Sequence, residues 1–168
     1  MITRQYTADG IVSRAKYSDC EHYRYLLERV WDGDRGVLMY VMLNPSKANE
    51  RDNDPTIERC QRRAVQLGYG GISITNLFAW RETHPSLLKK SSAPVGPAND
   101  RVMLNAARGA KTVLAAWGVH GTWMDRNRVV LLKLKNAKPP LVHLGLTKEG
   151  HPRHPLYVPY AQQLQPWQ

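Results

Sequence analysis

The pattern of apolar and polar positions centres on residues 37–43, where seven apolar residues run without interruption into Asn44-Pro45-Ser46. A run this short, bounded by a glycine-containing turn and a proline-containing turn, is too brief for a buried helix. It is typical of a parallel strand that is covered on both faces. Ligands of open α/β sheets bind beyond the carboxyl ends of the strands. We therefore expect Asn44, Pro45 and Ser46 to lie at a binding site.

The same succession of an apolar strand and a polar or aromatic turn recurs along the chain. Three further strands are predicted, at residues 72–78, 111–117 and 141–145. Helices are predicted at residues 55–67, 99–108 and 124–134. Asp54 and Pro55 begin the first helix, because Asp accepts from free backbone N–H groups and Pro lacks a donor at the first helical position. Asn99-Asp100 is the predicted cap of the second. Strands that alternate with helices predict βαβ units around a parallel sheet.

The pattern before residue 37 is different. Residues 11–17 and 23–31 are mixed apolar and polar segments around a turn, and they fit an antiparallel hairpin, although the second also fits a nine-residue helix. Proline and glycine make residues 79–98 a long loop. We expect one domain over residues 1–168, with a hairpin extension at 1–36, an α/β core at 37–157 and a tail at 158–168.

Composition narrows the class of protein. Cys20 and Cys60 are too few for a disulfide framework and lack ligand spacing, so no cofactor or metal is expected. The first residues lack a signal peptide, and no apolar run reaches the roughly 20 residues of a membrane span. We therefore predict a monomeric cytoplasmic protein that makes no contact with a membrane. The net charge of +10 and a pI of about 9.9 favour nucleic acid or nucleotide as the partner, although a generally solvated basic surface is the alternative.

Four predicted strand ends converge on one edge of the sheet, and their side chains can bind different parts of a nucleotide. Asn44 and Asn76 offer amides that pair with a base, Trp117 offers a stacking surface, and residues 147–157 concentrate basic side chains. The alternative for both asparagines is that they cap turns.

The carboxylates and the histidines near the same edge of the sheet each allow two interpretations. Asp52 and Asp54 suit a divalent ion or a general base, but Asp54 already has a role as a helix cap. His151 and His154 lack a third ligand, so phosphate or base contacts are favoured over a metal site. Ser46 has no recognisable histidine and acid partners, which argues against a serine nucleophile.

Four motifs resemble those of a family of uncharacterised bacterial and phage proteins, a domain of unknown function. The resemblance covers nearly the whole chain, and the motifs are Leu43-Asn44-Pro45-Ser46, Asn53-Asp54-Pro55-Thr56, Thr75-Asn76-Leu77-Phe78 and the segment from Gly150 to Tyr157.

The order of motifs also looks like the uracil-DNA glycosylase superfamily. Asn44-Pro45 resembles the end of its first strand, where a residue positions the attacking water. Asn76 resembles the asparagine that reads a pyrimidine edge, and His154-Pro155-Leu156 resembles its closing motif with a wedge residue. Met42 replaces the usual glycine, the closing motif ends in Leu instead of Ser, and the four cluster cysteines of some branches are absent.

The residue pattern and this second resemblance together predict a fold and a set of roles, and the strand order comes from the resemblance. The fold is a three-layer α/β/α sandwich with a central four-stranded parallel sheet in the order 2-1-3-4, plus the N-terminal antiparallel hairpin. The catalytic residues are Asn44, His154 and Asp54. The base-binding or ligand-binding residues are Pro45, Ser46, Asn76, Phe78, Trp117, Gly118, Leu156 and Tyr157. The phosphate-binding residues are Lys47, Lys148, His151 and Arg153.

The expected function is nucleic-acid binding, with DNA favoured over RNA. Within this class we expect a glycosylase-like hydrolase that removes a damaged or modified base, in DNA repair or base modification. An amide is no general base at neutral pH, so such an enzyme depends on electrostatic stabilisation of the leaving base. The alternatives are a catalytically silent binding module and an enzyme that acts on free nucleotides.

Overall fold

The apolar run forms β4 (Val37–Met42) near the middle of a sheet. In the computed structural model, which describes residues 1–168, every side chain of β4 after Val37 is buried. Leu38, Tyr40 and Met42 pack into one apolar core, and Met39 and Val41 pack into a second core on the opposite face. Alternating side chains point to opposite faces of a strand, so the continuous apolar run reflects burial on both faces.

Three parallel strands accompany β4, namely β5 (Gly71–Asn76), β6 (Thr112–Ala115) and β7 (Leu141–His143). β4 pairs with β5 on one side and with β6 on the other, and β6 pairs with β7. These four strands therefore lie in the order β5-β4-β6-β7. Their carboxyl ends lie at one edge of the sheet, which positions the loops after them together.

The predicted fold class is nevertheless wrong, because the sheet is a single mixed sheet of eight strands in the order β1-β2-β3-β5-β4-β6-β7-β8. β1 (Ile2–Ala8), β2 (Ile11–Tyr17) and β3 (Arg24–Val30) continue it beyond β5, and β8 (Gln165–Pro166) pairs with β7. Four of the seven pairings are antiparallel. An unpaired strand edge leaves N–H and C=O groups without hydrogen-bond partners. β3 supplies these partners for the free edge of β5. The N-terminal segment is thus part of the sheet and not an added hairpin.

The antiparallel pairing of residues 11–17 with residues 24–30 is confirmed, and the helical alternative for residues 23–31 is wrong. β1 was not predicted. It is an edge strand with no buried side chain, so it lacks the apolar alternation by which a half-buried strand is recognised.

Four α-helices accompany the sheet, α1 (Pro55–Gln66), α2 (Pro85–Leu88), α3 (Asn99–Gly109) and α4 (Arg126–Lys135). Short 3₁₀ turns lie at η1 (Gly33–Arg35), η2 (Val119–Asp125) and η3 (Pro155–Tyr157). The predicted start of α1 is confirmed, since Asp54 Oδ1 accepts from the Ile57 N–H at 2.9 Å. The predicted cap of α3 is wrong, because Ala98 occupies the N-cap position and Asn99 already lies in the helix.

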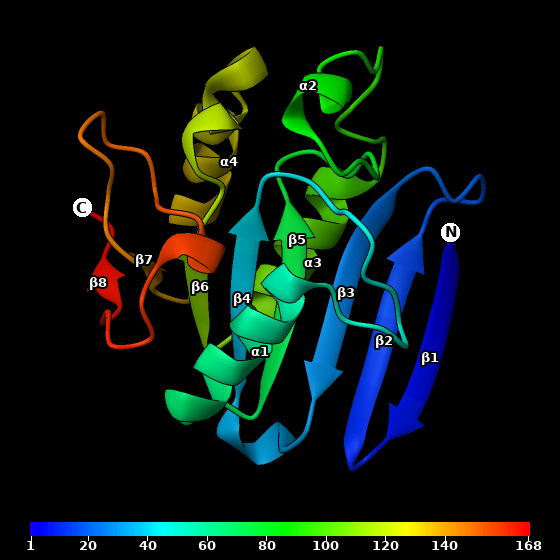
Figure 1. The fold of residues 1–168 in the computed structure, drawn as a ribbon, viewed down its shortest axis with the longest axis vertical. Helices are drawn as coiled ribbons and strands as arrows, with labels where there is room; N and C mark the ends of the chain where they lie inside the picture. The colour runs from blue at the N-terminus through cyan, green and yellow to red at the C-terminus, as the bar shows by residue number, and fades with distance from the viewer.

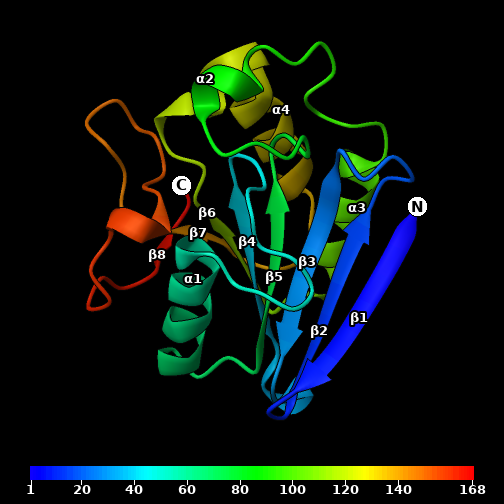
Figure 2. The ribbon, with the colours of Figure 1, turned by 45° about the vertical axis from the view of Figure 1, so that its right-hand side comes forward.

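The helices cover both faces of the sheet. α1 lies in front of the sheet and α3 behind it (Figure 1), and the turned view separates them (Figure 2). Ile57, Cys60 and Ala64 of α1 belong to the first core, whereas Met103 of α3 and Val130 of α4 belong to the second. None of the four helices combines the length and hydropathy that a membrane-spanning segment requires.

Candidate functional site

A cavity of about 730 Å³ lies where the loops after the parallel strands meet the first turn of α1. Its wall includes residues of the loops that follow β4, β5, β6 and β7. This is the edge at which the sequence predicted a site, and the volume falls within the range of small-molecule sites.

Ten of the predicted site residues line this cavity. They are Asn44, Ser46, Lys47, Asp54, Trp117, Gly118, Arg153, His154, Leu156 and Tyr157. The three predicted catalytic residues are among them, although they come from three separate segments of the chain.

Five predicted site residues do not line the cavity, namely Pro45, Asn76, Phe78, Lys148 and His151. Asn76 lies beside Met42 in the sheet, and its side chain is buried without lining the cavity. Phe78 is fully buried and packs against Trp123, with ring centroids 4.9 Å apart. Burial in the core explains why an aromatic residue just beyond a strand end is unavailable to a ligand.

Asn44 ties two of the cavity loops together. Its Nδ2 donates to the carbonyl oxygens of Glu82, at 2.6 Å, and Pro45, at 3.2 Å. The Glu82 N–H donates in return to the Pro45 oxygen at 2.9 Å. The amide nitrogen is thus occupied by the scaffold, which leaves Oδ1 of Asn44 as the group that a ligand can use.

His154 and Asp54 both line the cavity. The Leu156 N–H donates to Nδ1 of His154 at 3.2 Å, so a neutral His154 carries its proton on Nε2 as a donor. Burial lowers the pKa of His154, and the charge of Asp54 opposes this shift. The histidine is therefore neutral at pH 7 and acts as a hydrogen-bond donor there.

The charges around the cavity are unevenly distributed. Lys47, His120 and Arg153 are exposed at its rim, whereas Asp54 and Glu82 are half-buried. Tyr157 is also at the rim, with 75% of its surface exposed. No group of three or more His, Cys, Asp or Glu side chains is arranged to hold a metal ion. The site suits an organic ligand that carries an anionic group near the rim.

Sequence reasoning missed Arg24, which lines the cavity from β3. Arg24 is 2% exposed, and its Nη1 donates to the Ala48 oxygen at 2.6 Å. It lies near the start of the predicted segment 23–31, away from the carboxyl ends of the four predicted parallel strands, and follows an aromatic residue in an ordinary strand pattern. Only the pairing of β3 with β5 brings it to this edge.

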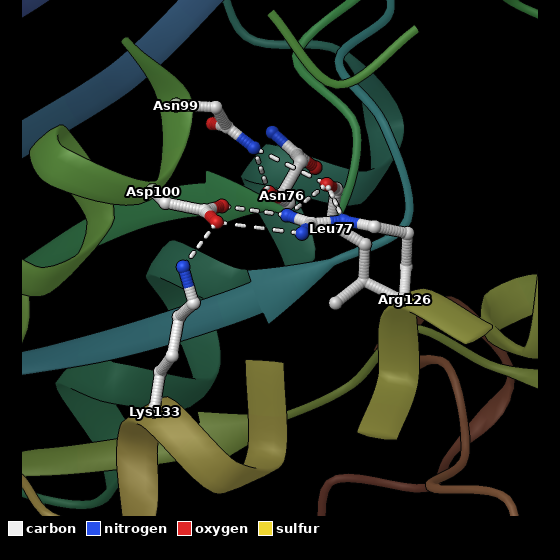
Figure 3. Close-up of polar contacts among 6 residues, drawn as sticks. All are labelled: Asn76, Leu77, Asn99, Asp100, Arg126 and Lys133. Carbon is white, nitrogen blue, oxygen red and sulfur yellow. Dashed lines mark hydrogen bonds and ion pairs between the residues drawn. The ribbon is translucent and has the colours of Figure 1, made fainter. Parts of the chain in front are cut away.

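A polar cluster fastens the end of β5 to α3 and α4 (Figure 3). Asn99 Nδ2 donates to the oxygens of Asn76, at 2.9 Å, and Leu77, at 3.2 Å. Arg126 also donates to the Leu77 oxygen and forms an ion pair with Asp100, to which Lys133 donates as well. Asn76 contributes only its backbone oxygen, and both polar atoms of its buried side chain lack partners. These bonds fix the positions of the loops that follow β5 and β6.

Residues 24–156 match the family described as "Protein of unknown function (DUF1643)". The chain belongs to this family. The match extends from β3 to η3 and contains all the residues that line the cavity except Tyr157. No curated protein and no solved structure is similar enough to the chain to match it, and the resemblance to the uracil-DNA glycosylase superfamily gains no support.

Proposed function

We propose that this protein binds nucleic acid by holding one unpaired nucleotide in the cavity. The observation that carries the proposal is the separation of apolar side chains, in the interior of the cavity, from basic side chains, at its rim. Met42, Leu43, Ile57 and Trp117 provide a buried apolar interior, and basic side chains stand at the rim. A nucleotide has the same division, with an apolar planar base and an anionic phosphate.

The charge of the whole chain supports a strand of nucleic acid as the source of that nucleotide. An excess of ten positive charges attracts a polyanion more strongly than a mononucleotide. Lys47, His120 and Arg153 lie where the phosphates beside a bound nucleotide would pass. Tyr157 offers an exposed ring on which a neighbouring base can stack.

Binding to single-stranded DNA and RNA oligomers and to mononucleotides, titrated at several salt concentrations, tests the proposal. We expect oligomers to bind more tightly, with an affinity that falls steeply with salt because bound phosphates release counterions. Arg153→Gln and Lys47→Gln should each lower the salt slope by about one. Lys135→Gln is the matched control, because it removes the same charge from the far end of α4. Mononucleotides that bind as tightly as oligomers would favour a small-molecule enzyme instead, and no binding at low salt would refute the proposal.

A second candidate, hydrolysis of the N-glycosidic bond of a damaged or modified base, is favoured by the pairing of neutral His154 with Asp54. Water adds to C1′ of the sugar and loses a proton, the electron pair of the broken N-glycosidic bond leaves with the base, and the departing base anion takes up a proton. Nε2–H of His154 stabilises the departing base, while the Asp54 carboxylate or Oδ1 of Asn44 orients the water.

Oligonucleotides that bear uracil, mismatches and modified bases, treated with alkali after incubation, reveal any abasic sites. Activity should be lost in His154→Ala and Asn44→Ala. Undiminished strand binding without base release across the panel would instead identify a silent binding module.

A further inference from the structure

The buried wall of the cavity contains one charged side chain, that of Arg24. The other buried residues of the wall are Met42, Leu43, Ile57 and Trp117, which are apolar apart from the indole N–H. A guanidinium in such surroundings needs hydrogen-bond partners for its N–H groups, because unpaired buried donors are costly.

Arg24 is only partly satisfied by the protein. Nη1 donates to the Ala48 oxygen, but Nε is buried without a partner. None of the eight ion pairs of the structure includes Arg24. Burial lowers the pKa of Arg24 to about 10, so the side chain stays charged at neutral pH. A donor is thus available at the inner end of the cavity.

A second arginine on the same strand shows what a purely structural role looks like. Arg29 donates to Asn49, Asn53 and Glu28, and it does not line the cavity. Both arginines hold the loop between β4 and α1, yet only Arg24 also lines the cavity and keeps a guanidinium that the protein satisfies in part.

The charge beside Arg24 decides which ligand group meets it. Asp54 is the acidic group that most favours the charged form of Arg24. Its Oδ1 accepts from Ile57, which leaves Oδ2 as a further acceptor at the cavity. A phosphate placed between Arg24 and Asp54 would be repelled by the carboxylate. A neutral group with an acceptor next to a donor suits both side chains.

We infer that Arg24 reads a ring carbonyl oxygen of the bound base, with Asp54 accepting from the adjacent ring N–H, so that the nucleotide enters with its base innermost. The ligand class is a nucleotide with a –NH–C=O edge, in a 6-oxopurine or a 4-oxopyrimidine. This edge is engaged in a base-paired duplex, so the base must be unpaired. The inference rests on the proposed function and specifies its substrate class.

The test compares two pairs of nucleotides that differ at the carbonyl. They are inosine and purine riboside 5′-monophosphates, and uridine and pyrimidin-2-one riboside 5′-monophosphates. Wild-type protein should prefer the carbonyl member of at least one pair by about 10-fold to 100-fold, the range for a hydrogen bond to a charged donor. Arg24→Met should reduce this preference about 10-fold or more, and any preference that remains comes from the ring N–H, which the second member of each pair also lacks and which Asp54 accepts. Arg29→Met, the matched control, should retain it even if the loop becomes less stable.

The outcomes separate the two proposals. Equal binding of both members by the wild-type protein, or a preference that Arg24→Met leaves undiminished, would overturn the inference and leave nucleotide binding intact. If Arg24→Met does not fold, the wild-type preference and the conservative Arg24→Lys variant still decide, because a lysine lacks the planar set of donors. Failure of the wild-type protein to bind any nucleotide or oligomer would refute both proposals.

Discussion

At the scale of single residues, His154 joins the scaffold to the cavity. Its Nδ1 caps η3 by accepting from the Leu156 N–H, and its ring lies 5.8 Å from the ring of the exposed Tyr157. Burial lowers the pKa of His154 below its ordinary value of 6.5. Between the lowered pKa and 6.5 the unfolded chain binds more protons at this position than the folded protein does.

This difference predicts that His154 destabilises the fold in acid. Its contribution to the free energy of unfolding is fully present above about pH 6.5 and is lost as the pH falls through the pKa of the folded state. Thermal unfolding of the wild-type protein across this range should therefore show a falling Tm. Burial also lowers the pKa of His143, so His154→Asn should remove part of the fall and not all of it.

Asparagine retains an acceptor for the Leu156 N–H, which isolates the effect of titration from the loss of the cap. His84→Asn, at an exposed position, should keep the full dependence on pH. An unchanged pH profile in His154→Asn would contradict the assignment.

At the scale of elements, α1 supports the segment that closes the cavity. Arg59 donates to the oxygens of Pro155, at 3.0 Å, and Val158, at 2.7 Å. Arg63 donates to the oxygens of Val158, at 2.8 Å, and Pro159, at 3.1 Å. Two arginines one turn apart thus fix η3 and the chain after it, and with them the positions of His154 and Tyr157.

We predict that Arg63→Met destabilises the protein by about 2–4 kcal/mol. Arg63 is 1% exposed, and its loss removes two charge-assisted hydrogen bonds, to the Val158 and Pro159 oxygens, together with a buried guanidinium that packs there. Urea denaturation measures the change. Arg62→Met is the control on the same helix, because the Arg62 side chain is 63% exposed and its ion pair with Glu58 contributes at most about 1 kcal/mol. Equal losses in both variants would show that the contacts with η3 do not stabilise the fold.

At the scale of the whole molecule, the N-terminal strands are required to complete the sheet. The family match begins at residue 24, so β1 and β2 lie outside it. Ala15 and Tyr17 of β2 nevertheless belong to the same core as Leu38 and Tyr40 of the central strand. A chain that lacks residues 1–22 would expose part of this core and leave β3 as an unpaired edge.

We therefore expect the chain that starts at residue 23 to aggregate or to lose cooperative unfolding. Sedimentation and circular dichroism during heating measure these properties. The matched control removes residues 1–9 alone, which deletes the whole of an edge strand without buried side chains and should preserve a cooperative transition. A soluble, cooperatively folded product of the longer truncation would show that the family segment folds without β2.

Local sequence patterns determined the parallel strands, the start of α1 and the edge of the sheet at which a cavity forms. Each of these depends on neighbours within a few residues. Burial on both faces requires the continuous apolar run of β4, and Asp54 meets the Ile57 N–H only three residues away. The loops after parallel strands converge whatever their sequence, which is why Asn44, Trp117 and His154 were placed correctly at the cavity.

Tertiary structure alone decided the mixed sheet and the place of Arg24 at the cavity, because these features depend on pairings between distant segments. The antiparallel contact of β3 with β5 made the sheet mixed and brought Arg24 to the cavity, and no pattern within either strand specifies that contact. Asn76 ends β5 but is buried and does not line the cavity, whereas Arg24 of β3, one strand farther from β4, does. A strand end is visible in the sequence, but packing between distant segments decides which side chains near it face a cavity.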